Sequence, residues 1–230
     1  PNRIYADYNA TAPLREAARN AMIGAMEAVG NPSSVHGPGR AARALIETAR
    51  RHVAALVGAL PQTVVFTSGG TEASALAIKG CGRSRIITSA IEHEAVLAAA
   101  PDAVRLPVDD QGILDLDALR QALSGGGGNC LVSVQWANNE TGAVQPIDEI
   151  VRVAHAHGAL VHSDAVQAAG KLPIDMNASG IDLMSLSAHK IGGPAGVGAL
   201  IVREGLDMKA VQSGGGQEKG RRSGTENKIG

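Results

Sequence analysis

The stretch 182–203 reads DLMSLSAHKIGGPAGVGALIVR, in which a glycine-rich loop separates two apolar runs, DLMSLS and GALIVR. Both runs predict buried strands, because their apolar residues occupy both faces. Lys190 lies between them, after SAH and before a run of glycines that leaves the backbone open to approach. A lysine at such a place is most often a surface residue before a loop. The alternative is an amine that forms a Schiff base with a carbonyl compound.

Five more apolar runs predict strands: TVVFTS (63–68), RIITS (85–89), AVRLPV (103–108), CLVSVQW (130–136) and ALVHSD (159–164). Helical patterns lie before and between them, at residues 14–29, 40–57, 72–78, 94–100, 115–123 and 147–157. This alternation is typical of the α/β class. We therefore expect a mostly parallel seven-stranded sheet flanked by helices.

The composition excludes several partners. Lysine and arginine number 21 against 22 acidic residues in 230, for a net charge of −1, and aromatic residues make up 2%. A protein without a basic surface or aromatic stacking groups is a poor candidate for nucleic-acid binding. The longest uncharged run near Lys190, IGGPAGVGALIV, has 12 residues, and a membrane span needs ~20. We expect no nucleic-acid partner and no membrane segment.

The two ends of the chain and its two cysteines indicate the cellular compartment of the protein. The chain opens PNRIYADYNATAP, without the apolar stretch of a signal peptide. Cys81 and Cys130 form no CxxC pair and are interpreted as small buried hydrophobic residues. These features predict a cytoplasmic protein. The missing initiator Met and the ending TENKIG indicate a piece of a longer protein.

Ligands of parallel sheets collect at the carboxyl ends of the strands. Those ends carry polar or titratable groups in five segments: FTSGGTE, SAIEHE, QWANNETG, HSDAVQ and SLSAHK. In TSGGTE, two glycines and a threonine at a strand-to-helix turn suit an anion, although a simple helix cap has the same pattern. The sequence lacks the GK[ST] of a Walker A loop there. These five strand ends predict an active site at one edge of the sheet.

Each polar group has a structural alternative. Asp164 ends a strand, where it could pair with a protonated ring nitrogen or cap a helix formed by AVQAA. His93 could stack on a planar ring and move protons, or cap a helix. The amides of Asn138 and Asn139 suit a phenolate or a substrate carboxylate. Together with Lys190 and the anion-binding turn, this set matches the needs of pyridoxal phosphate.

Two other readings are weaker. His155, His157, His162 and Asp164 are candidate metal ligands, but the two histidines of the predicted helix point to different sides, and the remaining two ligands are too few. GPGRAA at 37–42 matches a dinucleotide-binding pattern, yet NPSSVH precedes it where a strand is required. We expect neither a metal nor a dinucleotide site.

The motifs, in order, resemble those of cysteine desulfurases of the NifS/IscS type, which are pyridoxal-phosphate enzymes of the class V aminotransferase group. They are YADYNATAP, GNPSSVHGPG, VVFTSGGTEASALAIKG, ITSAIEHEAVL, NNETGAVQPI, HSDAVQAAGKLPID, SAHKIGGPAGVGAL and GGGQEKGRRSGTEN. The resemblance runs from Ile4 to Asn227. It implies the large domain of a fold type I, aspartate aminotransferase-like transferase. It also implies desulfuration of L-cysteine to L-alanine, an enzyme persulfide and sulfur transfer for iron–sulfur cluster assembly.

The resemblance implies a role for each matching residue. Lys190 and His93 are implied as catalytic, as the Schiff-base lysine and the stacking residue that helps to protonate intermediates. Asp164 is implied as the partner of the pyridine nitrogen, Gln167 as the donor to the ring phenolate, and Asn139 as an amide near the phenolate and substrate carboxylate. The implied phosphate ligands are Gly70, Thr71, Ser187 and His189, with Thr225 contributed by the other subunit of a homodimer.

The resemblance also implies a division of the chain: residues 1–14 as an arm of the small domain and residues 15–230 as the cofactor-binding large domain. The rest of the small domain, the mobile loop with the sulfur-accepting cysteine and a later substrate-binding arginine lie beyond Gly230 in the family. We therefore expect this chain to be inactive alone, with an iron–sulfur scaffold or another protein as acceptor of the sulfur. The alternatives are a selenocysteine lyase, another class V enzyme, or a non-catalytic fragment that binds pyridoxal phosphate.

Overall fold

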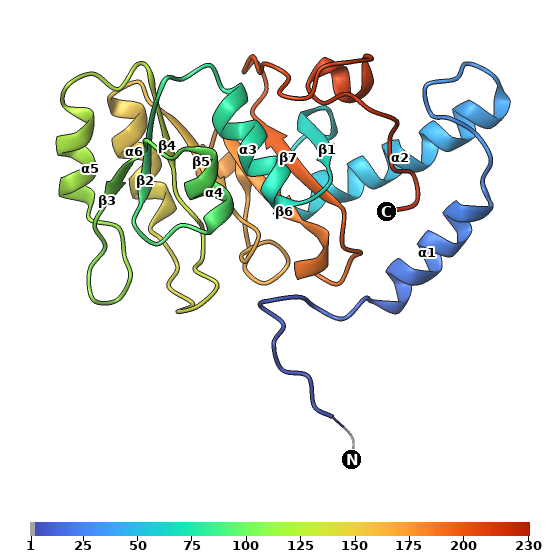
Figure 1. The fold of residues 1–230 in the computed structure, drawn as a ribbon, viewed down its shortest axis with the longest axis horizontal. Coiled ribbons are helices and arrows are strands. Elements are labelled where there is room, and N and C mark those ends of the chain that lie inside the picture. The colour runs from blue at the N-terminus through green and yellow to red at the C-terminus, as the bar shows by residue number, and fades with distance from the viewer. Residues whose placement is uncertain (1–2) are drawn as a thin grey trace.

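A computed structural model describes residues 3–230, and in that part seven strands form one sheet in the order β1-β7-β6-β5-β4-β2-β3 (Figure 1). The strands are β1 (Val64–Thr67), β2 (Arg85–Ser89), β3 (Val104–Leu106), β4 (Cys130–Ser133), β5 (Leu160–Asp164), β6 (Leu183–Ser187) and β7 (Gly198–Val202). From β6 to β3 all neighbours are parallel, whereas β7 is antiparallel to both β6 and β1. The predicted α/β class and all seven predicted strands are confirmed.

The helices agree with the sequence pattern except at their ends. They are α1 (Glu16–Glu27), α2 (Gly37–Leu56), α3 (Gly70–Gly80), α4 (Glu94–Ala99), α5 (Leu116–Leu123), α6 (Ile147–Ala156) and α7 (Met176–Ser179). α2 begins three residues before the expected position 40, because the His36 side chain accepts from the Gly39 amide and Pro38 suits a first turn. α3 begins at Gly70 rather than at residue 72. α7 was not predicted, since four residues are too few to show a helical period.

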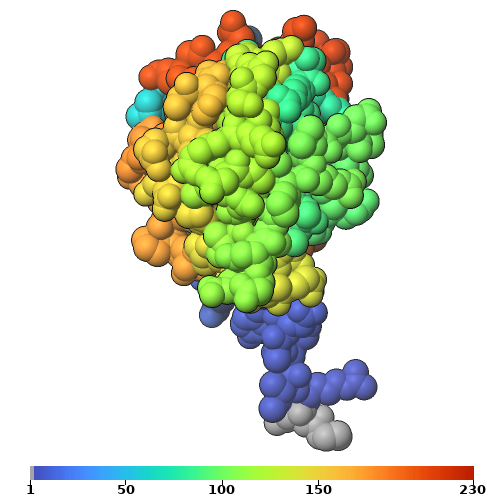
Figure 2. Space-filling view, turned by 90° about the vertical axis from the view of Figure 1, so that its left-hand side faces the viewer, coloured from blue at the N-terminus to red at the C-terminus, as the bar shows by residue number. Residues whose placement is uncertain are grey.

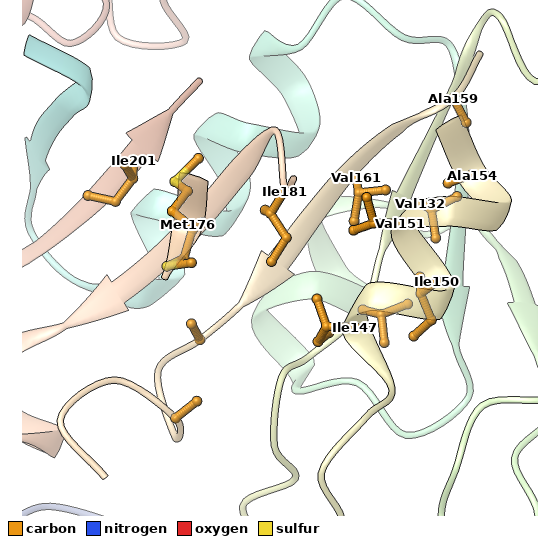
Figure 3. Close-up of a cluster of buried hydrophobic side chains, with 14 of the residues drawn as sticks. Val132, Ile147, Ile150, Val151, Ala154, Ala159, Val161, Met176, Ile181 and Ile201 are labelled. Carbon is orange, nitrogen blue, oxygen red and sulfur yellow. The ribbon is translucent and has the colours of Figure 1, made fainter. Parts of the chain in front are cut away.

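Alternate residues of the strands build two separate cores. On one face, Val132, Val161 and Ile201 pack against α2, α5, α6 and α7 (Figure 3). On the other face, Leu131 and Leu160 pack against α3 and α4. Successive strand side chains point to opposite faces, so each apolar run supplies both cores. This arrangement fixes the register and therefore the positions of the strand ends.

The carboxyl ends of β2, β4, β5 and β6 lie at one edge of the sheet, because these strands are parallel. Two antiparallel pairings in succession give β1 the same direction as β6, so β1 also ends there and delivers α3 to this edge. Gly198, the first residue of β7, lies against this turn, and a Cβ on it would come within 2.5 Å of the Gly69 carbonyl carbon. The close packing of Gly198 on Gly69 therefore sets the start of α3.

The N-terminal segment has no helix or strand from residue 3 to residue 15. Two backbone hydrogen bonds attach it to the body, from the Ala12 amide to the His189 carbonyl oxygen at 2.8 Å and from the Arg15 amide to the Gly192 carbonyl oxygen at 2.9 Å. Asn9 adds side-chain and backbone contacts to the edge of the sheet, and the residues before it project from the main body (Figure 2). The predicted arm, residues 1–14, includes Pro1 and Asn2, which lie outside the described residues, and the division into domains stays a prediction. Among residues 3–230, no helix combines the length and the apolar character that crossing a membrane requires.

Candidate cofactor site

A cavity of about 160 Å³ opens at the carboxyl edge of the sheet. Nine of the ten predicted site residues line it: Gly70, Thr71, His93, Asn139, Asp164, Gln167, Ser187, His189 and Lys190. They come from the ends of β2, β5 and β6, from the start of α3 and from the loop after β4. The structure thus brings together groups that are up to 120 positions apart (190 − 70) in the sequence. Their roles toward a cofactor stay predictions.

Thr225 does not line this cavity. It is exposed, in the segment that follows the short 3₁₀ helix η3 (Gln217–Gly220). The prediction placed this residue in the site of a second subunit, so a position outside the cavity of its own chain does not test it.

Lys190 ends a 3₁₀ turn, η2 (Ala188–Lys190), that directly follows β6. Its Nζ donates a hydrogen bond to the carbonyl oxygen of Asn9 in the N-terminal segment. Burial lowers the pKa of Lys190, while the charges of Asp164 and Asp7 oppose that shift. A larger fraction of this amine is therefore neutral at a given pH than in an exposed lysine, and the neutral amine is the nucleophile.

Asp164 ends β5, and its side chain is buried next to the cavity. Its Oδ1 accepts a hydrogen bond from the Val166 amide at 3.0 Å. The side chain therefore caps the chain that follows, but residues 166–171 form turns and not the predicted helix. Burial raises the pKa of Asp164, while that hydrogen bond and the charges of His93 and Lys190 lower it. A buried carboxylate that faces a cavity favours a cationic group there. The cap and the cation-binding role are therefore compatible.

His93 is the N-cap residue of α4, and its Nδ1 accepts from the Ala95 amide at 3.1 Å. The capping alternative is thus correct for one nitrogen of the ring. Because Nδ1 acts as acceptor, the neutral ring carries its proton on Nε2. The ring also lines the cavity, so capping holds in place a group that can exchange a proton there.

The start of α3 supplies an anion-binding turn. The first backbone N–H groups of a helix lack partners within the helix and favour an anion, and Gly70 and Thr71 line the cavity at this point. A Cβ on Gly70 would lie 2.9 Å from Val166 Cγ2 and 3.4 Å from Ser187 Cβ. Glycine is therefore needed for α3 to lie this close to the ends of β5 and β6.

The two asparagines after β4 have different tasks. The Asn138 Oδ1 accepts from the amides of Glu140 and Thr141, each at 2.8 Å, and so holds the turn. Asn139 faces the cavity. The sequence pattern made both amides candidates, and the resemblance implied Asn139. In the structure the side-chain oxygen of Asn138 is used within its own turn.

Gln135 also lines the cavity and was not predicted. Its backbone amide donates to both carboxylate oxygens of Glu92, at 3.1 and 2.9 Å, and Ser89 Oγ donates to the same carboxylate. Burial raises the pKa of Glu92 to about 8. The signal was present in QWANNETG, where Gln135 precedes the predicted amides, but a glutamine within a strand pattern does not stand out. Ala95, Ala137 and Val166, which complete the lining, carry no chemical signal at all.

The histidines considered as metal ligands have other partners in the structure. His162 is fully buried between Ser133 Oγ and Ser185 Oγ, each 2.8 Å from a ring nitrogen, and burial lowers its pKa to about 3. His155 Nε2 bonds to Asp182 at 2.9 Å instead. Within residues 3–230 no three His, Cys, Asp or Glu side chains cluster as metal ligands would.

Two further expectations concern the GPGRAA segment and the two cysteines. GPGRAA forms the first turns of α2 after an irregular segment, so the strand required for a dinucleotide site is not there. Cys81 and Cys130 are buried, as expected. Cys81 follows the end of α3 and Cys130 begins β4, which places both at the edge of the sheet opposite the cavity.

Comparison with known proteins decides the family. Residues 4–227 match the family model described as aminotransferase class-V. The chain belongs to the class-V aminotransferase family. Members of this family depend on pyridoxal phosphate, so the expected cofactor class agrees with the family.

Within the class-V family, several similar proteins are named cysteine desulfurase or NifS-like protein. A cysteine desulfurase of Cereibacter sphaeroides is 47% identical over 98% of this chain and 62% of its own length. A solved NifS-like protein superposes with a TM-score of 0.94 at 37% identity, over 100% of this chain and 67% of that one. A structure described as SspA in complex with cysteine has a TM-score of 0.92 at 35% identity, over 99% of this chain and 70% of that one. The chain spans about three fifths of the length of the curated relatives that it matches.

The groups that line the cavity also suit pyridoxal phosphate, the cofactor of the class-V family. The start of α3 offers backbone N–H groups to a phosphate, and Gly70 leaves the space that a Cβ would fill. Lys190 offers an amine of lowered pKa, and Asp164 offers a buried carboxylate to a cationic ring nitrogen. The residues of the cavity therefore fit pyridoxal phosphate.

Proposed function

We propose that this chain is the pyridoxal-phosphate-binding portion of a cysteine desulfurase. The full-length protein would convert L-cysteine to L-alanine and hold the sulfur as an enzyme persulfide. The observation that carries this proposal is the meeting of Lys190, Asp164, His93 and the start of α3 in one cavity. Relatives named cysteine desulfurase and a related structure with cysteine support the choice of substrate.

Pyridoxal phosphate, when bound, supplies an aldehyde carbon and a ring that accepts electrons. Lys190 is proposed as the amine that bonds to it, because burial keeps more of this amine neutral. Asp164 would keep the ring nitrogen protonated, and His93 would lie against the ring. The phosphate would be held by Gly70, Thr71, Ser187 and His189.

The remaining residues orient and move protons. Gln167 and Asn139 offer amide groups at the cavity wall, for the ring phenolate and the substrate carboxylate. His93, through Nε2, and the Lys190 amine would carry a proton to or from the substrate. Thr225 would complete the phosphate site of a partner subunit in a homodimer. The full-length protein would work in the cytoplasm and pass sulfur to an iron–sulfur scaffold or another acceptor protein.

The test is made on the full-length protein with L-cysteine and, for comparison, L-selenocysteine. We expect release of alanine from L-cysteine, with sulfide released when a reducing thiol is present. Replacing Asp164 with Asn should lower alanine production by at least about a hundredfold while pyridoxal phosphate still binds, because the electron sink is lost. Alanine formed from L-selenocysteine alone, or at a normal rate by the Asp164→Asn variant, would contradict the proposal.

A further inference from the structure

A second lysine lies beside the proposed cofactor site. Lys171 lies in the turn region after β5, and its Nζ donates to Gln167 Oε1 at 2.5 Å and to Asn9 Oδ1 at 3.2 Å. The rest of its side chain is exposed. Its two partners have different origins, one in the loop of the sheet edge and one in the N-terminal segment.

A lysine ammonium has three donors and no acceptor. It can therefore bond only to the oxygen side of a neighbouring amide, and it fixes which way the amide faces. For Gln167, whose Oε1 is held by Lys171, the Nε2 group is left to donate to the Asn9 carbonyl oxygen at 2.8 Å. For Asn9, whose Oδ1 is also held, Nδ2 donates to the Asn139 carbonyl oxygen at 3.1 Å. One ammonium thus sets the orientation of two amides.

We propose that Lys171 is a positioning residue of the cofactor site, whose ammonium orients the Gln167 amide so that its N–H side serves the cavity and secures Asn9 over Lys190. This inference rests on the proposed function. Without Lys171, the Gln167 amide can turn by 180° and present its oxygen to the phenolate oxygen of pyridoxal phosphate. Two acceptors would then face each other, and the hydrogen bond would be lost.

One neighbouring cation, Lys190, acts on this lysine. Burial and the charge of Lys190 lower the pKa of Lys171. The charge of Lys190 also lowers the pKa of His189, after burial. Both contacts of the Lys171 amine are with acceptor oxygens, so the hydrogen-bond geometry and not the neighbouring charge supports the orienting role.

The first experiment requires no cofactor. In the ¹⁵N-labelled chain, the side-chain NH₂ signals of Gln167 and Asn9 are followed in the parent and in the Lys171→Met, Lys171→Arg and Lys79→Met variants. Lys79 is exposed, near the end of α3, and serves as the matched control. We expect resolved, slowly exchanging signals in the parent and in the control, averaged signals in Lys171→Met, and partial recovery in Lys171→Arg. Unchanged Gln167 signals in Lys171→Met would overturn the inference.

The second experiment measures the dissociation constant and the absorbance–pH profile of bound pyridoxal phosphate in a double-mutant cycle. Lys171→Met should weaken binding about tenfold and shift the profile, and Lys171→Arg should restore part of both. In the Gln167→Ala background, Lys171→Met should add little. Full additivity in the cycle would overturn the inference. Failure of the parent to bind pyridoxal phosphate, with the expected NMR result, would instead reject the proposed function and leave the orienting role of Lys171 in place.

Discussion

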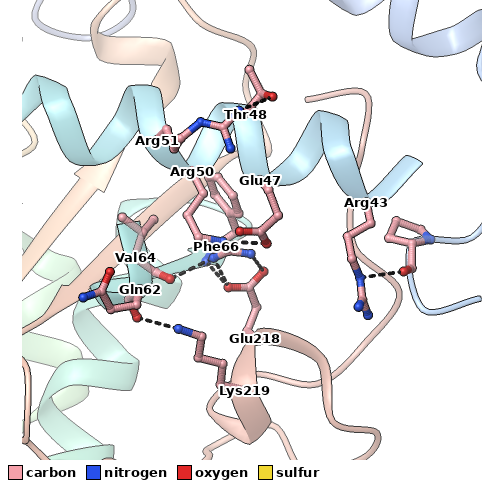
Figure 4. Close-up of polar contacts among 11 residues, drawn as sticks. Arg43, Glu47, Thr48, Arg50, Arg51, Gln62, Val64, Phe66, Glu218 and Lys219 are labelled. Atoms are coloured by element: carbon pink, nitrogen blue, oxygen red, sulfur yellow. Dashed lines mark hydrogen bonds and ion pairs between the residues drawn. The ribbon is translucent and has the colours of Figure 1, made fainter. Parts of the chain in front are cut away.

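Arg50 and Glu218 are 168 positions apart, yet both carboxylate oxygens of Glu218 accept from the Arg50 guanidinium, at 2.7 and 3.0 Å (Figure 4). Both side chains are almost fully buried. Arg50 also donates to the Val64 carbonyl oxygen, and Glu218 accepts from the Phe66 amide. This pair therefore joins α2, β1 and η3, and it holds the backbone of Glu218 in the left-handed region at φ 47°.

Breaking this pair should be costly. Replacing Arg50 with Met leaves a buried carboxylate without its cation, so we expect a loss of about 3–5 kcal/mol in the free energy of unfolding. Urea denaturation measures it. The exposed pair Arg120–Asp117 provides the control, and Arg120→Met should cost less than about 0.5 kcal/mol. The double variant Arg50→Met/Glu218→Leu should lose less than the sum of its single changes, and simple additivity would contradict a coupled pair.

Lys190 should be the residue labelled by the cofactor. Borohydride reduction of the chain with pyridoxal phosphate should leave pyridoxyl on Lys190, found by peptide mapping, because burial lowers the pKa of this amine. The Lys190→Ala variant should carry no stoichiometric label. A label on Lys171 or Lys209 instead would show that the nucleophile has been assigned wrongly.

Two buried groups should oppose each other in the dependence of stability on pH. Burial lowers the pKa of His162 to about 3, so its contribution to stability is lost as the pH falls from about 6.5. Burial raises the pKa of Glu92 to about 8, so stability is gained as the pH falls from about 8 toward 4.5. Each slope is at most ~1.4 kcal/mol per pH unit. Between about pH 6.5 and 4.5 the two contributions should cancel.

The Glu92→Gln variant separates these two contributions. Relative to the parent, it should lose about 2 kcal/mol of unfolding free energy between pH 6.5 and pH 5, measured by urea denaturation at both pH values. Burial also raises the pKa of Asp164, which adds a gain on acidification nearer to its ordinary range. Glu94→Gln, a change at an exposed neighbour, should follow the parent. Parallel curves for Glu92→Gln and the parent would mean that Glu92 titrates normally.

The two cysteines should be dispensable for any sulfur chemistry at the cavity. Both lie at the opposite edge of the sheet, and burial raises the pKa of the Cys81 thiol, which leaves it protonated and unreactive. The variant with Ser at both positions should release sulfide from L-cysteine at the same rate as the parent, whatever that rate is. Sulfide release that depends on Cys81 or Cys130 would place the reacting thiol within this chain.

Gly198 and Gly24 should respond in opposite ways to alanine. A Cβ at Gly198 would meet the backbone of Gly69 at 2.5 Å, so Gly198→Ala should cost about 1–3 kcal/mol and move the start of α3. Gly24 lies within α1 with open space around it. Its replacement should stabilise the protein by about 0.5–1 kcal/mol. Thermal melting compares the two, and equal effects would contradict the packing argument.

The sheet and the site were predictable for the same reason. Runs that are apolar on both faces mark buried parallel strands, and polar residues that follow such runs must meet at one edge, as Asp164 and Lys190 do. The spacing of apolar residues also predicted the six longer helices, α1 to α6, with bounds within a few residues of those observed.

The contacts that the sequence could not predict depend on the finished fold. Nothing around Asn9 or Lys171 indicates that they meet, because the residues are 162 positions apart. Glu218 likewise shows no local sign of its partner Arg50. Gln135 and Glu92 lie in ordinary strand-end sequence, and only the pairing of β2 with β4 reveals that they touch.

The Asn9–Lys190 contact also sets an order of events on the ribosome. Lys190 is synthesised 181 residues after Asn9. At roughly 5–20 residues per second, that delay is on the order of 10–40 s. The other partners of Asn9 appear during this time, first Asn139 and then Gln167 and Lys171. The lining of the proposed cofactor site is therefore complete only when synthesis has passed Lys190.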